Sequence, residues 1–83
     1  MVDYYEIEIN GNFILYLNKE GKRHRLNGPA VIYNKGYQEW RIDGQLHRLD
    51  GPAVIFDDGN KFWFIDGIGM TESDFISDSR SLL

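Results

Sequence analysis

The chain has no cysteine among its 83 residues and only two histidines. Neither a disulfide framework nor a thiolate metal site can therefore stabilise it, and two histidines alone make a poor ligand set for zinc. The missing cysteines fit a reducing cytosol. Stability must come from a small core of aliphatic and aromatic residues or from a partner subunit, because a chain this short is near the lower limit for a self-sufficient core.

Long apolar runs, a basic excess and catalytic motifs are missing as well. No stretch approaches the roughly 18 apolar residues of a membrane span, and residues 1–5 lack the start of a signal peptide. The formal net charge of −4 argues against direct binding of nucleic acid, which needs clustered Lys and Arg. Neither a phosphate loop nor a nucleophile elbow is found. We therefore expect a cytoplasmic protein with no membrane association, no cofactor, no metal and no enzyme activity.

What the sequence does contain is a repeat of twenty-three residues. Residues 24–33 return as residues 47–56, and Trp40 returns as Trp63. Thirteen of the twenty-three aligned positions are identical. Composition alone does not produce such a match, so the repeat is the unit of folding.

Alternation of apolar and polar residues predicts the strands. Residues 4–9 alternate strictly, Asn10-Gly11 is a strong hairpin signal, and residues 13–17 return as a strand that is apolar on both faces. Each full repeat contains one further hairpin with a glycine in its turn. The strands expected in the two repeats are residues 30–33 and 38–42, and residues 52–56 and 61–65.

The end of the chain has a different period. Thr71 is expected to cap a short helix, with Asp74 completing a weak capping box. One apolar stripe of this helix contains Phe75, Ile76, Leu82 and Leu83. Because so short a helix is marginal alone, we expect its stripe to pack on one face of the sheet.

The predicted fold is mainly β: an antiparallel meander of hairpin repeats with about six strands and one C-terminal α-helix packed on the sheet. It forms a single domain over residues 1–83. Residues 1–23 are a degenerate capping hairpin, 24–46 and 47–69 are the repeats, and 70–83 contain the helix.

Polar residues recur in both repeats and are the first candidate site. They are His24, Arg25 and Asn27, with His47, Arg48 and Asp50 in the second copy. In one interpretation they line a groove that binds a small anionic ligand such as a signalling nucleotide, since guanidinium groups suit phosphate. In the scaffold interpretation the arginines bond turn carbonyls or stack on aromatic rings, the Asn and Asp side chains accept turn N–H groups, and the histidines pack against tryptophan.

Aromatic residues are the second candidate site. Phe62 and Phe64 face away from Trp63, so aromatic surface exceeds what one short helix can hide. The excess is either a partner or homodimer interface, or it is buried by curling of the sheet. The expected protein-binding residues are Trp40, Phe62, Trp63 and Phe64, with the acidic Asp57 and Asp58.

The pattern His-Arg-x-Asp/Asn-Gly-Pro-Ala, followed by Gly and then Trp-x-Ile-Asp-Gly, resembles a short repeat of phage and large-virus proteins. It is similar to MORN-type repeats, which are hairpins stacked into an extended sheet. The resemblance covers residues 21–76. It implies a phage-encoded, non-enzymatic module in the host cytoplasm that inhibits a host protein, with host defence as the expected target. A structural repeat unit of a viral assembly is the other expectation.

Overall fold

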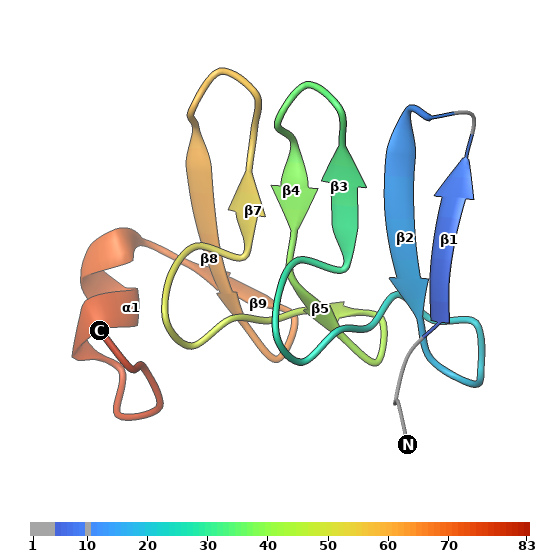
Figure 1. The fold of residues 1–83 in the computed structure, drawn as a ribbon. Helices are drawn as coiled ribbons and strands as arrows, with labels where there is room; N and C mark the ends of the chain where they lie inside the picture. The colour runs from blue at the N-terminus through green and yellow to red at the C-terminus, as the bar shows by residue number, and fades with distance from the viewer. Residues whose placement is uncertain (1–4, 10) are drawn as a thin grey trace.

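A computed structural model describes residues 5–9 and 11–83 of the chain (Figure 1). These residues form short strands and one helix. The elements are β1 (Tyr5–Ile9), β2 (Phe13–Leu17), β3 (Val31–Tyr33), β4 (Gln38–Glu39), β5 (Arg41–Ile42), β6 (Gln45–Leu46), β7 (Val54–Ile55), β8 (Lys61–Ile65), β9 (Ile68–Met70) and α1 (Glu72–Ser77).

The main sheet has seven strands in the order β1-β2-β3-β4-β7-β8-β9, and all neighbouring strands are antiparallel. Three hairpins stand side by side with their turns at the same edge of the sheet (Figure 1). The mainly β meander with one C-terminal helix is therefore confirmed. The strand number was underestimated, because β9 extends the sheet and β5 and β6 form a separate two-stranded ribbon.

The single strand expected at residues 38–42 is divided at Trp40. β4 ends at Glu39, and β5 pairs with β6 through the tight turn Asp43-Gly44. Both turn residues have positive φ, 49° for Asp43 and 86° for Gly44. This conformation defines a type I′ turn, which Asp-Gly favours because aspartate tolerates the left-handed region and glycine adopts it freely. The sequence interpretation ended a strand here, whereas the structure makes a second hairpin.

The two repeats make equivalent backbone contacts. Arg25 N donates to Arg41 O, and Arg48 N donates to Phe64 O, both at 3.1 Å. The first hairpin makes a contact of the same kind. Tyr16 N donates to Ala30 O at 2.9 Å, just as Trp40 N donates to Ala53 O at 2.7 Å. Gly11 has a φ of 68° in the turn of that hairpin. Asn10, the other half of the expected turn, lies outside the described residues.

The core is small, and its residues come from β2, β3, β7, β8, the residues just before β3 and β7, and α1. The hydrophobic residues buried in the described chain are Tyr16, Ala30, Val31, Ala53, Val54, Ile65 and Phe75. Ala30 and Ala53 are fully buried at equivalent positions just before β3 and β7. A side chain larger than alanine would find no space there, which explains why both copies of the repeat have alanine at this position.

The helix begins as expected but ends early. The Thr71 hydroxyl accepts a hydrogen bond from Asp74 N at 3.1 Å, which confirms the cap. The helix ends at Ser77, so the prediction that Leu82 and Leu83 continue its stripe was wrong. The Asp78 carboxylate accepts bonds from Arg80, and Leu82 N donates to Leu49 O at 2.6 Å, so the chain turns back toward the second repeat.

The helix lies beside β8 at the end of the sheet, and it does not extend over the hairpins (Figure 1). Phe75 is its buried residue, with no exposed surface, while the neighbouring Ile76 points outward. The helix therefore occupies the position next to the second repeat where a third repeat would otherwise stack.

Replacing Phe75 with Ala tests this role of the helix. We expect a loss of about 3–5 kcal/mol in the free energy of unfolding, because a fully buried phenyl ring is replaced by a cavity. Ile76→Ala is the matched control and should cost well under 1 kcal/mol, since the side chain is exposed. Urea denaturation followed by circular dichroism measures both. Equal effects of the two substitutions would contradict the capping role.

Candidate functional site

The His-Arg loops are held in place by their arginines. The Arg25 guanidinium lies 4.0 Å from the centre of the Tyr16 ring, and Nη1 donates to Pro29 O at 3.2 Å. Arg48 repeats this arrangement, 3.9 Å above the Trp40 ring, with Nη1 donating to Pro52 O at 3.0 Å. These are the turn-carbonyl and ring contacts of the scaffold interpretation.

The second copy of this loop adds a carboxylate. Arg48 Nε donates to Asp50 Oδ1 at 2.9 Å. The first copy has the neutral Asn27 at the equivalent position, where it is exposed. The two loops are therefore alike in shape but differ by one negative charge.

Each histidine binds the Asp-Gly turn at the end of its own repeat. His24 Nδ1 accepts a hydrogen bond from Asp43 N at 2.9 Å, and His47 Nδ1 accepts one from Asp66 N at 3.0 Å. A neutral imidazole that accepts at Nδ1 has its proton on Nε2. Each histidine thus fixes a type I′ Asp-Gly turn, a role that the sequence pattern did not predict.

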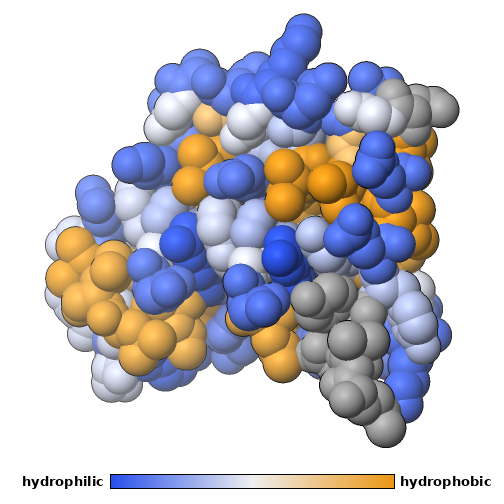
Figure 2. All heavy atoms as spheres, in the orientation of Figure 1, coloured by the Kyte–Doolittle hydropathy of each residue, from blue (hydrophilic) through white to orange (hydrophobic). Residues whose placement is uncertain are grey.

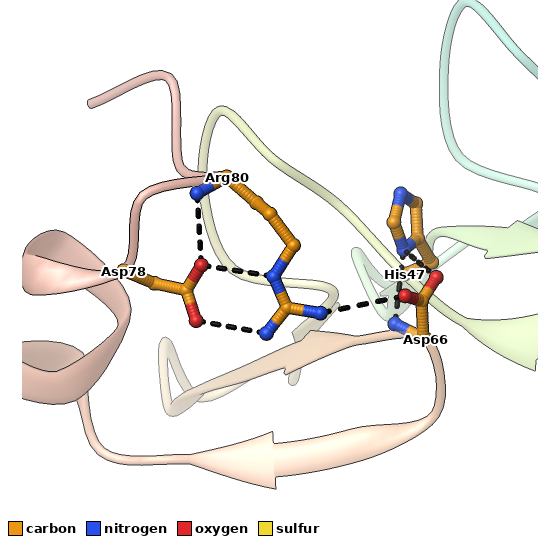
Figure 3. Close-up of polar contacts among 4 residues, drawn as sticks. All are labelled: His47, Asp66, Asp78 and Arg80. Carbon is orange, nitrogen blue, oxygen red and sulfur yellow. Dashed lines mark hydrogen bonds and ion pairs between the residues drawn. The ribbon is translucent and has the colours of Figure 1, made fainter.

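The carboxylates of these turns are also bonded. Asp43 Oδ1 lies 3.3 Å from His24 Nδ1 and accepts from Asn18 Nδ2 at 2.9 Å. Asp66 approaches His47 in the same way, at 3.2 Å, but Arg80 replaces the asparagine with a contact of 3.4 Å (Figure 3). The same turn is therefore bound by a neutral amide at one end of the array and by a cation at the other.

Arg80 is held by Asp78 through two parallel bonds, from Nε at 2.9 Å and from Nη2 at 2.8 Å (Figure 3). These side-chain bonds, with a further one from the Arg80 backbone, lower the pKa of Asp78 to about 2. Through Arg80, the residues after the helix are thus bonded to Asp66, in the last turn of the second repeat.

A groove of about 630 Å³ lies between the two His-Arg loops. Its lining is Arg25, Leu26, Asn27, Gly28, Trp40, Ile42, His47, Arg48, Leu49, Asp50 and Leu82. The structure thus brings together five of the six predicted ligand-binding residues, and His24 is the one outside the lining. The volume suits a small ligand. However, Arg48 is already bonded to Asp50 and Pro52, so an anion would have to compete with both.

A row of aromatic rings crosses the other face of the sheet. Centroids of successive rings are 5.0, 5.3, 5.2 and 5.5 Å apart, which are contact distances for tilted and edge-to-face pairs. We call this row the aromatic stripe. Its members are Phe13, Tyr33, Tyr37, Phe56 and Phe62.

Strand register places the stripe on one face. Residues paired across antiparallel strands share a face, and Phe13 pairs with Tyr33 while Val54 pairs with Phe62. Tyr16 and Trp40 belong to the opposite face, which the His-Arg loops cover. Among the described residues no element covers the stripe, and Phe62, Tyr33 and Phe56 are 48%, 39% and 39% exposed.

A buried carboxylate holds the central ring of the stripe. Glu39 pairs with both Val31 and Val54 in the middle of the sheet and is only 8% exposed. It accepts a short hydrogen bond from the Tyr37 hydroxyl and a bond of 2.7 Å from Arg41 Nε. Because the Tyr37 ring belongs to the stripe, this bond fixes the position of the ring.

Burial and hydrogen bonding shift the pKa values of Glu39 and Tyr37 in opposite directions. Burial alone raises the pKa of Glu39, but hydrogen bonds from Tyr37 and Arg41 outweigh it and hold the pKa below its usual value. Burial, and then the hydrogen bond to Glu39, raises the pKa of Tyr37 to about 12. A carboxylate and a neutral phenol are thus the stable pair over a wide pH range.

The structure divides the predicted protein-binding residues between both faces. Phe62 belongs to the stripe, and Phe64 is half-buried on the same face, opposite Gly69. Trp40 lies under Arg48 on the other face. Trp63 pairs with Met70 there, and its indole N–H is buried without a hydrogen-bond partner among the described residues. The two tryptophans therefore cannot share a contact surface with the two phenylalanines.

The acidic candidates lie at the tip of the hairpin formed by β7 and β8. Asp57 and Asp58 are both exposed in the turn between β7 and β8. Asp58 accepts hydrogen bonds from Asn60 N and Nδ2, both at 3.0 Å, and so shapes the turn. Asp57 directly follows Phe56 of the stripe.

Sequence reasoning missed the cluster of Tyr37, Glu39 and Arg41. A signal was present in the repeat alignment, because Glu39 and Arg41 stand where the second copy has Phe62 and Phe64. Two charges at positions that are aromatic in the other copy indicate an internal ion pair on the apolar face.

Comparison with protein-family models, curated proteins and solved structures found no match to this chain. In the described part of the chain, no group of three or more His, Cys, Asp or Glu side chains is placed to hold a metal ion. The helix α1 has six residues, and no helix in that part is long and apolar enough to cross a membrane.

The two interpretations of the His-Arg loops differ in what Arg48→Ala does. We expect a loss of about 1–3 kcal/mol in the free energy of unfolding, from the ring contact and the lost carbonyl bond. Lys35→Ala, an exposed residue in a hairpin turn, should change it by less than about 0.5 kcal/mol. Urea denaturation measures both. Unchanged stability in Arg48→Ala would refute the scaffold interpretation.

The raised pKa of Tyr37 predicts a loss of stability at high pH. Above an ordinary tyrosine pKa of about 10, the unfolded chain loses the phenol proton while the folded chain keeps it until about pH 12. Since the folded state then binds more protons, the free energy of unfolding falls as pH rises through this window. Denaturation curves between these pH values should show a steeper fall for wild type than for Tyr37→Phe. If the stability of wild type and of Tyr37→Phe fell equally with pH, the raised pKa of Tyr37 would be wrong.

Proposed function

We propose that this chain is a small, non-enzymatic protein-binding module that docks a partner protein through the aromatic stripe. The observation that carries this proposal is an uncovered sheet face with five rings in mutual contact. Contiguous exposed apolar surface of this kind is typical of interaction sites.

The composition of the stripe supports a protein partner. Tyrosine and phenylalanine are enriched at protein interfaces, where they bury large areas and lose few rotamers. Charge pairing beside the stripe adds to this, because the buried Glu39 is paired with Arg41 and approached by Arg23 at 3.8 Å. A partner that covers the stripe therefore does not have to bury an unpaired charge.

The ring geometry suits a protein partner better than a strand of stacked bases. Proteins that bind single strands stack successive bases on the faces of their aromatic side chains. In the stripe the planes of successive rings are inclined by 49°, 59°, 63° and 84°. The net charge of −4 is also unfavourable for a nucleic-acid strand. A protein surface, which is irregular in shape, fits inclined rings better.

Preorganisation is the second support. The hydroxyl of Tyr37 is bonded to the buried Glu39, and the neighbouring rings of Tyr33 and Phe56 contact Tyr37 on either side. Rings that are fixed before binding lose less conformational entropy in the complex. On the resemblance to repeats of phage proteins, the partner is a host protein, and inhibition of host defence is the role that we propose for the complex.

Affinity capture from host-cell lysate with quantitative mass spectrometry tests the proposal. Wild type should retain one stoichiometric protein partner. A variant with Tyr33→Ser, Phe56→Ser and Phe62→Ser should capture at least tenfold less of this partner, because a few aromatic side chains dominate most interfaces. Circular dichroism confirms that the variant is folded.

The matched control removes exposed apolar side chains elsewhere. Leu26, Leu82 and Leu83 are 67%, 72% and 62% exposed and lie outside the stripe, and Figure 2 shows apolar atoms gathered at the end of the molecule that carries α1 and the C-terminus. Their replacement by Ser should leave capture unchanged. The proposal fails if this control, or Arg48→Ala, loses the partner while the stripe variant retains it.

A further inference from the structure

β1 is the edge strand of the main sheet, and no other strand of the described residues pairs with its open side. Tyr16 uses its N–H and C=O on the β3 side, bonding Ala30 O at 2.9 Å and His24 N at 2.8 Å. Backbone groups alternate in direction along a strand, so the odd residues of β2 bond β1. Their partners in the register are Tyr5, Ile7 and Ile9. The N–H and C=O groups of Glu6 and Glu8 therefore face the open edge.

The side chains of this edge carry one sign of charge. Glu6 and Glu8 are exposed on one face, and neither has an ion pair among the described residues. On the other face Tyr5 is 57% and Ile7 is 39% exposed. This apolar side is continuous with the aromatic stripe, since Ile9 pairs with Phe13. β1 has no proline, lysine or bulge, so the negative charges of Glu6 and Glu8 are its protection against unspecific pairing.

A second copy of this chain does not suit the edge. Antiparallel pairing of two β1 strands about Ile7 would place Glu6 of each copy directly opposite Glu8 of the other. Like charges that are directly opposite are destabilising. The neighbouring strand β2 has the sequence FILYL and supplies no cation to offset them.

We infer that the β1 edge accepts a strand of the partner protein that has Lys or Arg opposite Glu6 and Glu8 and apolar residues between them. The strand gains backbone hydrogen bonds from the edge, two opposite-charge pairs on one face, and contact with Tyr5 and Ile7 on the other. The inference rests on the proposed function, because the apolar side of the added strand extends the surface that the stripe begins. It names the chemistry of the segment that binds there.

Two short peptides with the patterns TVKVKVT and TVEVEVT are the probes. Titration of each into isotope-labelled protein, followed by NMR, gives the affinity and the amides that are affected. Wild type should bind the lysine peptide about tenfold more tightly than the glutamate peptide, from two cross-strand charge pairs. Hydrogen exchange of the Glu6 and Glu8 amides should slow on binding.

The doubly substituted protein Glu6→Lys, Glu8→Lys is the matched variant, and it should reverse the preference. A lysine peptide with N-methyl groups on the amides that face β1 keeps its charge but cannot pair, so its binding should be lost. Absence of binding at millimolar lysine peptide, equal binding of the methylated peptide, or an unchanged preference in the charge-reversed variant would each overturn the inference. Dimerisation of wild type that the charge reversal abolishes would also overturn it.

These outcomes are separate from those of the proposed function. Loss of the captured partner from the stripe variant, together with no peptide binding, would leave the stripe as the interface and remove the edge strand from it. If the peptide binds and the stripe variant still captures the partner, strand addition at the β1 edge is supported and docking on the aromatic stripe is refuted.

Discussion

The hydrogen bond from an Asp-Gly turn to the histidine of the preceding loop is the contact on which the array depends. It joins residues nineteen positions apart and occurs twice with nearly the same length, 2.9 and 3.0 Å. The bond orients the type I′ turn of Asp43 or Asp66, and the turn sets where the next loop begins. Within each loop, Arg25 or Arg48 contacts an aromatic ring and a proline carbonyl.

This arrangement makes the sheet one-sided. The loops pack on the face of Tyr16 and Trp40, and α1 packs against the end strand β8. On the other face, none of the described elements covers the aromatic stripe. Its apolar residues contact one another laterally in the stripe, and the one carboxylate on it, Glu39, is neutralised within the face by Arg41. Val31 and Val54 are buried on this face beside Glu39, while the rings of the stripe remain partly exposed.

Much of the fold could be predicted from the sequence because its signals are local. The twenty-three-residue period, the alternation in β1 and β2 and the Thr71 cap each need only a short window of residues. The helix end could not be predicted in this way. Phe75, Ile76 and the last two leucines have helical spacing, but the bonds between Asp78 and Arg80 form a turn that apolar periodicity does not represent.

The candidate site was less accessible to sequence reasoning. The stripe takes its rings from five segments, and whether Phe13 meets Tyr33 depends on the register between strands that are far apart in the chain. The two tryptophans are the most conspicuous aromatic residues of the repeats, yet they lie on the opposite face. Glu39 and Arg41 break the likeness between the copies, and only the folded sheet shows that they serve Tyr37.

The equivalent contacts of the two repeats have a consequence for how such a protein can change over evolutionary time. Each unit ends in an Asp-Gly turn that its own histidine binds, while the first hairpin and α1 close the two ends. A duplication of one unit in the gene would therefore lengthen the sheet between unchanged ends, and the open face would grow with it. Contact area in this architecture can be gained or lost in whole steps, without redesign of the core.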